Sequence, residues 1–130
     1  MIVDSAAIVA ILKEEPEGQR LLRALMVEQE PKRMSAANYL EAAIVVDANR
    51  NPVLSRRLDD LIAGAAVVIE PVTHAQAEIA RAAYRDFGKG SGHPASLNFG
   101  DCFACALAKA TREPLLFKGD DFSQTDVAAA

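Results

Sequence analysis

Short apolar runs alternate with longer stretches of helical pattern along the chain. The runs at residues 1–3, 66–70 and 115–117 consist mainly of apolar and β-branched residues, with Asp, Gly or Pro nearby, which is typical of short buried strands. The longer stretches repeat apolar residues every three to four positions or are apolar on all sides, and they predict helices. The predicted helices cover residues 6–12, about 17–28, 35–50, about 53–63, about 74–87 and 99–111.

Polar and turn-forming residues mark the ends of these elements. Ser35 and Thr73 each precede a helical stretch and are predicted N-caps. Residues 88–94, GKGSGHP, predict a flexible loop. They lack the spacing of a phosphate-binding P-loop and follow a helix rather than a strand. Residues 31–34 are a weaker strand candidate, and residues 127–130 are a candidate for a last strand fragment.

The order of these elements favours one α/β domain that spans residues 1–130. Strands that are separated by helices usually pair in parallel, because the chain must cross back before it begins the next strand. We therefore expect a central, mostly parallel sheet flanked by helices. The sequence has no internal repeat, low-complexity segment or linker that would divide it.

Composition narrows the class of protein. The chain has 130 residues, of which 51% are hydrophobic and 25% charged, as in a globular domain with its own core. Its longest apolar stretch, residues 63–69, is too short to span a membrane. Residues 1–4 do not begin a signal peptide, so we expect a cytoplasmic protein. Cys102 and Cys105 form a single C-x-x-C pair, which is too few ligands for structural zinc, and we expect buried thiols.

The net charge of −4 limits the ways in which the chain could act on nucleic acid. Proteins that hold nucleic acid by charge alone are usually basic. An acidic protein that acts on a phosphodiester needs something to offset its own charge at the site. A divalent cation is the obvious candidate.

Four acidic residues stand at positions that suit such a cation. Asp4 directly follows the first strand, and ligands of open α/β sheets bind at the carboxyl ends of the strands. Glu41 lies on a helical stretch among apolar neighbours, where an unpaired buried carboxylate would be costly. Carboxylates that converge at one edge of a sheet repel each other unless a cation such as Mg²⁺ or Mn²⁺ bridges them. The four acids are Asp4, Glu41, Asp101 and Asp120.

Each acid also has a structural interpretation. Asp4, with Ser5, can be a helix N-cap, and Asp101 can be an acid that favours the first turn of a helix. Asp120 can be a turn residue beside Gly119. Glu41 is the hardest to explain in this way. Position alone leaves both interpretations open.

The segments around these acids resemble PIN-domain ribonucleases, and in particular the VapC toxins of bacterial toxin–antitoxin pairs. Each segment by itself is weakly specific, but the four occur in the family's order and span nearly the whole chain. The matching segments are residues 1–7 (MIVDSAA), 34–41 (MSAANYLE), 97–104 (LNFGDCFA) and 115–122 (LLFKGDDF).

The resemblance implies an endoribonuclease in which Asp4, Glu41, Asp101 and Asp120 bind one or two Mg²⁺ or Mn²⁺ ions. It implies a supporting hydroxyl at Ser5. Three further implied properties are a VapB-like antitoxin partner, a homodimer and a structured RNA substrate such as tRNA or rRNA. Two residues are auxiliary: Asn38, one helical turn before Glu41, to orient that carboxylate or a water, and Asp121, as an alternative fourth acid.

A group of basic residues precedes the third acid along the chain. Arg81 and Arg85 are four residues apart on one predicted helix, and Lys89 and His93 continue into the loop that leads to Asp101. One interpretation is a solvated face whose charges pair with neighbouring acids. The other is a local basic patch that guides RNA phosphates to an acidic site.

Two other functions compete with the nuclease. A receiver-like phospho-acceptor domain is also small, acidic and α/β, but it needs an acidic pair at the first strand and a phospho-acceptor Asp at a mid-chain strand end. The chain has only Asp4 early on, and its mid-chain strand ends in Glu70 and Pro71. A non-catalytic PIN-like module that binds metal or RNA is the second alternative. The presence of all four acids disfavours it.

Overall fold

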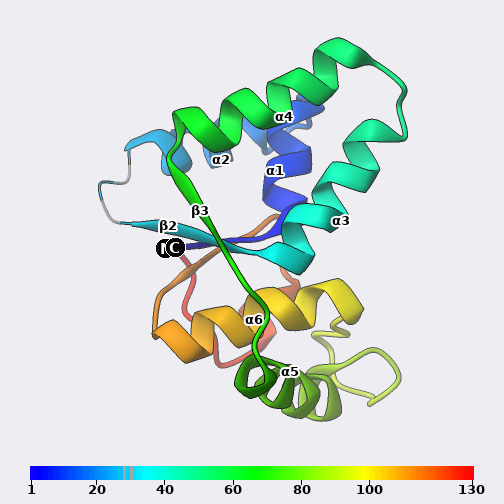
Figure 1. Cartoon of the computed structure of the whole chain (residues 1–130). Coiled ribbons are helices and arrows are strands. Elements are labelled where there is room, and N and C mark those ends of the chain that lie inside the picture. Colours follow the sequence, from blue (N-terminus) through cyan, green and yellow to red (C-terminus); the bar gives the residue numbers. More distant parts are fainter. Residues whose placement is uncertain (28, 30) are drawn as a thin grey trace.

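The chain folds into a four-stranded sheet with helices on both faces (Figure 1). The structure is a computed structural model and describes the chain except for residues 28 and 30. Helices α1–α4 cover one face of the sheet, and α5 and α6 cover the other. The elements are β1 (Ile2–Val3), α1 (Ser5–Leu12), α2 (Gly18–Val27), β2 (Lys32–Ser35), α3 (Ala36–Asp47), α4 (Pro52–Gly64), β3 (Val67–Glu70), α5 (His74–Phe87), α6 (Phe99–Thr111), β4 (Leu115–Leu116) and the 3₁₀ helix η1 (Asp121–Gln124).

All pairs in the sheet are parallel, and the strand order is β3-β2-β1-β4. The first strand is therefore central and pairs with the last, with Ile2 opposite Leu115. The tail adds to this edge, because the Leu115 N–H donates to the Ala128 carbonyl and the Ala130 N–H donates to the Leu115 carbonyl. The predicted α/β fold is confirmed, with a sheet that is parallel throughout.

The sheet separates two hydrophobic clusters. Successive strand residues point to opposite faces. Val3 and Leu116 accordingly belong to the cluster under α1–α4, whereas Ile2 and Leu115 belong to the cluster with α5 and α6. Both clusters contain fully buried side chains from several elements, so the helices are fixed on each side of the sheet.

Most predicted elements are confirmed, and the differences have local causes. The helices 74–87 and 99–111 agree at both ends, and Thr73 Oγ1 accepts from the Gln76 N–H as an N-cap. The predicted helix 35–50 is shorter, because Ser35 is the last residue of β2 and the helix ends at Asp47. Ser35 is the N-cap residue of α3, as predicted, but its buried hydroxyl makes no capping hydrogen bond. The predicted end of the second helix at residue 28 lies outside the described residues.

None of the described helices has the length and apolar character needed to cross a membrane.

Candidate active site

Asp4 stands between the central strand and the helix that follows it. Its backbone is extended, and its Oδ2 accepts from the Ala6 N–H at 3.1 Å, which caps α1. The side chain is buried, and within the described part of the chain its Oδ1 has no hydrogen-bond partner. The capping interpretation of Asp4 is therefore confirmed. It leaves one buried carboxylate oxygen unused.

Glu41 reaches the same place from α3. The Ser5 hydroxyl donates to Glu41 Oε1, and Asn38 Nδ2 lies 3.4 Å from that oxygen. The Glu41 side chain is half-buried. Its neighbours Leu40 and Ile44 are 57% and 60% exposed, so they belong to an outer face of α3 and do not bury Glu41. Ser5 and Asn38 thus contact Glu41 as expected.

Asp101 lies in the first turn of α6 and completes a capping box. The Asp101 N–H donates to Asn98 Oδ1 at 2.9 Å, and the Asn98 N–H donates to Asp101 Oδ2 at 3.0 Å. This reciprocal pair satisfies two backbone donors at the helix start. The prediction that Asp101 stabilises the first turn is confirmed. The same contacts fix the direction of its carboxylate.

These three carboxylates lie close enough to perturb one another. Burial, then the nearby charge of Asp101 and the smaller effect of Glu41, raise the pKa of Asp4 to about 7. Burial also raises the pKa of Asp101, with added contributions from Asp121 and Glu41. A hollow of about 240 Å³ lies over the cluster and is lined by Ser5, Glu41, Asn98 and Asp101 together with Ala6, Val9, Ala42 and Val45.

Two acids follow β4, Asp120 and Asp121, and both side chains are exposed. Asp121 begins η1, and its charge contributes to the raised pKa of Asp101. Asp120 is exposed and lines a different hollow of about 210 Å³ beside the tail of the chain. The next residue, Phe122, is 2% exposed and packs against Phe117 at 5.2 Å between ring centroids.

The acids share one feature that bears on cation binding. Asp4 and Asp101 each accept a hydrogen bond from a backbone N–H at the start of a helix through one carboxylate oxygen. Glu41 accepts through Oε1 from Ser5 and Asn38. Among the described residues, no group of three or more His, Cys, Asp or Glu side chains is arranged to hold one ion as the side chains stand. The unused oxygens nevertheless belong to the ligand class that Mg²⁺ and Mn²⁺ prefer.

Gly100 is a residue of the site that the sequence reasoning missed. A Cβ built at Gly100 would lie 2.1 Å from Glu41 Oε2, which is far inside van der Waals contact. The position is buried in the first turn of α6. A glycine directly before a candidate acid was the only signal, and it does not reveal which side chain needs the space.

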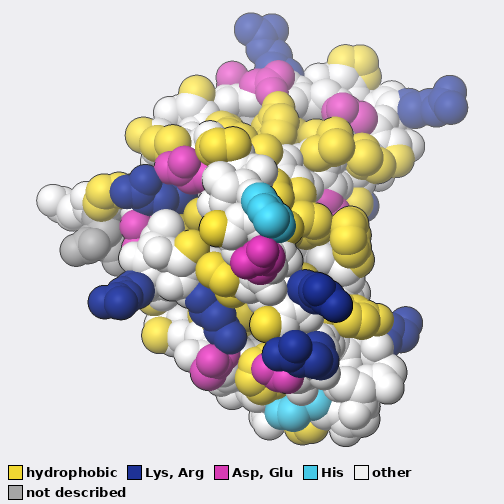
Figure 2. Space-filling model, turned by 60° about the horizontal axis from the view of Figure 1, so that its bottom comes forward, with side chains coloured by type: hydrophobic (Ala, Val, Ile, Leu, Met, Phe, Trp, Pro, Cys, Tyr) yellow, Lys and Arg dark blue, Asp and Glu magenta, His cyan; other side chains and the backbone are white. Residues whose placement is uncertain are grey.

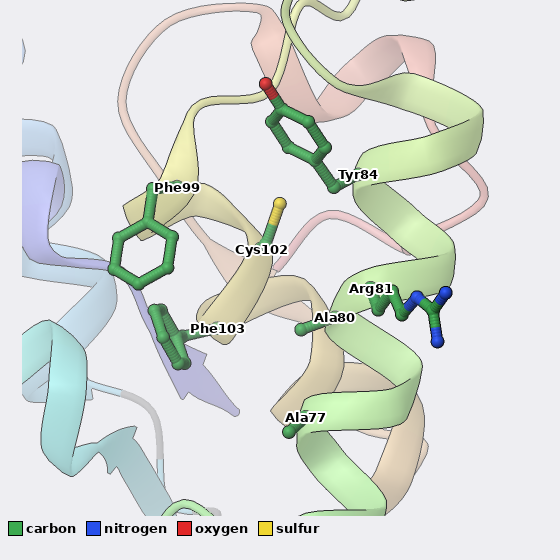
Figure 3. Close-up of a pocket in the computed structure, with 7 residues that line it drawn as sticks. All are labelled: Ala77, Ala80, Arg81, Tyr84, Phe99, Cys102 and Phe103. Atoms are coloured by element: carbon green, nitrogen blue, oxygen red, sulfur yellow. The ribbon is translucent and has the colours of Figure 1, made fainter.

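An apolar surface lies beside the cluster and was also missed. Phe99 is 77% exposed and packs edge-to-face on Phe103 at 4.9 Å. The two rings line a hollow of about 320 Å³ toward α5 (Figure 3). They also line a second hollow of about 360 Å³ toward α3. Helix α3 adds its exposed apolar side chains to the second hollow. We call Leu40, Ile44, Val45, Phe99 and Phe103 the α3/α6 face.

The predicted basic patch is only partly assembled. Arg85 pairs with Asp86 at 3.4 Å, and the Arg81 guanidinium points away from the hollow between α5 and α6 (Figure 3). His93 packs on Phe87, and its Nδ1 accepts from the Ala95 N–H. Lys and Arg side chains gather over the lower part of the face that Figure 2 presents, interspersed with acids. The basic residues therefore remain a prediction as RNA contacts.

The two thiols take no part in the site. Cys102 and Cys105 are free and buried. Burial raises the pKa of each thiol to about 11, so both are protonated at neutral pH and are poor nucleophiles.

Comparison with known proteins decides the family, because the PIN domain matches residues 1–128. The chain belongs to the PIN-domain family. Over its whole length this PIN domain is 57% identical to VapC ribonuclease Mb0625 of Mycobacterium bovis, covering 97% of that protein. It is 49% identical to ribonuclease VapC42 of Mycobacterium tuberculosis, covering 98% of that protein. The resemblance inferred from the four segments is thereby confirmed, and the receiver-like alternative is excluded.

Solved structures agree with the fold. The VapC20 toxin of Mycobacterium tuberculosis, which cleaves the sarcin-ricin loop, has a TM-score of 0.77 at 12% identity, covering 99% of this PIN domain and 97% of that chain. A chain from a toxin–antitoxin complex of Klebsiella pneumoniae has a TM-score of 0.72 at 15% identity, covering 99% and 95%. At such low identity these similarities concern the fold alone.

The raised pKa of Asp4 predicts a pH-dependent stability in the presence of EDTA. Between the ordinary pKa of 3.8 and the raised value of about 7, the folded chain retains a proton that the unfolded chain has lost. This contribution to stability is complete below pH 3.8 and is lost as the pH rises through about 7. Asp4→Asn keeps an oxygen for the cap but has no such proton. Its free energy of unfolding relative to the parent chain should therefore increase from pH 4 to pH 8.

Urea unfolding at each pH measures this difference. Asp59→Asn on the exposed face of α4 is the matched control, because it removes a carboxylate outside the cluster. Parallel pH profiles for the parent chain and Asp4→Asn would contradict the burial and charge coupling of Asp4.

Proposed function

We propose that this PIN domain is a metal-dependent endoribonuclease toxin that hydrolyses RNA phosphodiester bonds. The observation that carries the proposal is the buried Asp4 carboxylate, with an unused oxygen and the charges of Asp101 and Glu41 beside it. The ribonuclease relatives at 57% and 49% identity support the reaction class. We assign Asp4, Glu41, Asp101 and Asp121 as the ligands of one or two Mg²⁺ or Mn²⁺ ions.

The donor set fits such an ion in its chemistry. All four residues offer carboxylate oxygens, and a buried carboxylate oxygen without a partner is costly unless a cation or water satisfies it. When bound, the ion would lower the pKa of a coordinated water and offset the charge of the phosphate. Among the described residues, no His lines the hollow over the cluster to serve as a general base in its place.

The residues of the chain then have separate tasks. Ser5 and Asn38 hold the Glu41 carboxylate through Oε1. The start of α1 and that of α6 hold Asp4 and Asp101 through their Oδ2 atoms. These contacts hold three of the four proposed ligands near one another, so that small side-chain rotations would bring their free oxygens to one cation.

We propose that RNA is recognised by α5 and by the loop between α5 and α6. Arg81, Arg85, Lys89 and His93 lie on α5 and on the loop that leads to Asp101, and we propose that they contact substrate phosphates. Sequence-specific recognition of RNA mostly targets loops and other unpaired segments. We propose tRNA or rRNA as the substrate class.

Cleavage of total RNA tests the nuclease and its metal requirement together. The purified protein should produce discrete fragments with Mg²⁺ or Mn²⁺ and none with EDTA. Asp101→Asn should lose at least about a hundredfold in rate, since removal of a metal ligand disables charge stabilisation. This change keeps a side-chain oxygen for the capping box, so its urea midpoint should remain near that of the parent chain.

The binding-module alternative has a different signature in the same assay. Binding of Mn²⁺ or RNA without any fragments would support that alternative and contradict the nuclease. Fragments that persist in both EDTA and Asp101→Asn would indicate a contaminating enzyme.

The assignment of the fourth acid has its own test. Asp121→Asn should reduce the cleavage rate about tenfold or more, because the Asp121 charge lies near Asp101. Asp120→Asn is the matched control, one residue away and exposed, and should cleave like the parent chain. A larger loss for Asp120→Asn than for Asp121→Asn would reverse the assignment.

Two protein partners belong to the proposal. We propose a VapB-like antitoxin that covers the acid cluster, and the toxin–antitoxin complex among the similar structures supports this partner. We propose that a second copy covers the α3/α6 face, since homodimer interfaces are richer in apolar and aromatic side chains than the remaining surface. The exposed Phe99 and Ile44 are the centre of that face.

If two copies pair through the α3/α6 face, a charge on that face should halve the mass of the particle in solution. Ile44→Glu places a charge on a side chain that is 60% exposed in the single chain, so it should leave the fold intact and shift the protein to monomers. Sedimentation velocity measures this shift. Val53→Glu on α4, at 62% exposure and outside the α3/α6 face, should sediment like the parent chain. A monomeric parent chain, or two variants that sediment alike, would contradict the assigned interface.

A further inference from the structure

Asn38 is a buried polar residue that connects two helices at the site. Its side chain is fully buried in α3, and Nδ2 donates to the Gly100 carbonyl on α6 at 2.9 Å. The same nitrogen lies 3.4 Å from Glu41 Oε1. Asn is a poor choice for a helix interior, and a buried amide is costly unless it is bonded. A buried Asn within a helix therefore suggests a role that offsets these two costs. Its two contacts are with Glu41 and with Gly100, the residue that faces Glu41.

Gly100 is chosen for space and not for backbone conformation. The glycines of the described chain that have positive φ are Gly90, Gly92 and Gly119, so Gly100 does not need the left-handed region. Glycine also weakens a helix relative to alanine. The absence of a side chain at Gly100 leaves a slot that the Glu41 carboxylate occupies, because the three atoms nearest to a Cβ built there all belong to that carboxylate.

The two residues therefore constrain the same carboxylate from different directions. Asn38 holds α3 to α6 and donates toward Glu41 Oε1, while Gly100 leaves room for Oε2 against the start of α6. An alanine at position 100 would force the flexible end of Glu41 to rotate away. It would then lose the contacts that Ser5 and Asn38 make with Oε1.

We infer that Asn38 and Gly100 form a positioning pair that fixes the Glu41 carboxylate between α3 and α6 and thereby sets the affinity of the acid cluster for its divalent cation. The second part rests on the proposed function. Neither residue is a ligand in this arrangement. Both act through Glu41.

Mn²⁺ titration of the full chain tests the pair. Asn38→Ala and Gly100→Ala should each weaken Mn²⁺ binding about tenfold or more, the usual loss when a residue that orients a ligand is removed. Two matched controls exist. Asn49→Ala removes side-chain hydrogen bonds at the far end of α3, and Gly64→Ala adds a Cβ that meets no atom within 4 Å. Both controls should bind Mn²⁺ like the parent chain.

A second measurement in EDTA is independent of the metal. Gly100→Ala should lower the urea midpoint when Glu41 is present and should leave it unchanged or raise it in a Glu41→Ala background, where the obstructing carboxylate is gone and alanine favours the helix. The same change in both backgrounds would overturn the pair, as would unaltered Mn²⁺ affinity in both single variants. If the parent chain binds no Mn²⁺, the proposed metal dependence fails instead, and the unfolding cycle alone decides the positioning pair.

Discussion

Electrostatic repulsion among carboxylates is the constraint on which the arrangement of this domain depends. The central strand ends at Asp4, and the chain then brings Asp101 and Glu41 near enough to raise the pKa of that buried side chain. Each of these three acids is also held by hydrogen bonds at its own position. Two of the acids are held by helix starts and the third by a pair of side chains. At Asp4 and Asp101, the same hydrogen bond stabilises the start of a helix and orients the carboxylate.

The sequence was informative where residue type and position coincide. Asp4 and Asp101 follow from local rules, because strand ends and helix starts are visible in the pattern. Glu41 was singled out because its neighbours are apolar, which left it either exposed or buried with a partner. It is half-buried and contacts Ser5 and Asn38, whereas Leu40 and Ile44 form an uncovered outer face. Helix α3 has apolar residues both on the side that packs on the core and on the exposed side. The hydrophobic pattern therefore cannot distinguish the buried side from the exposed one.

Other features depend on three-dimensional detail that no spacing encodes. Asp121 begins η1 and contributes charge to Asp101, and the formation of this short helix after β4 was not predicted from the sequence. The slot at Gly100 depends on how α3 and α6 approach, which brings together residues 62 positions apart. Ser35 occupies the predicted N-cap position of α3, but it is also the last residue of β2 and its hydroxyl makes no capping hydrogen bond. Local signals predicted the elements, and tertiary contacts placed the side chains.

The pairing of the first strand with the last has a consequence for the synthesis of the chain. Strand β1 acquires its neighbour β4 only after residue 116 has been made, and Asp121 follows later still. Asp4, Glu41 and Asp101 are therefore all made before the strand that completes the sheet beside β1, so this edge of the sheet is the last to form during synthesis.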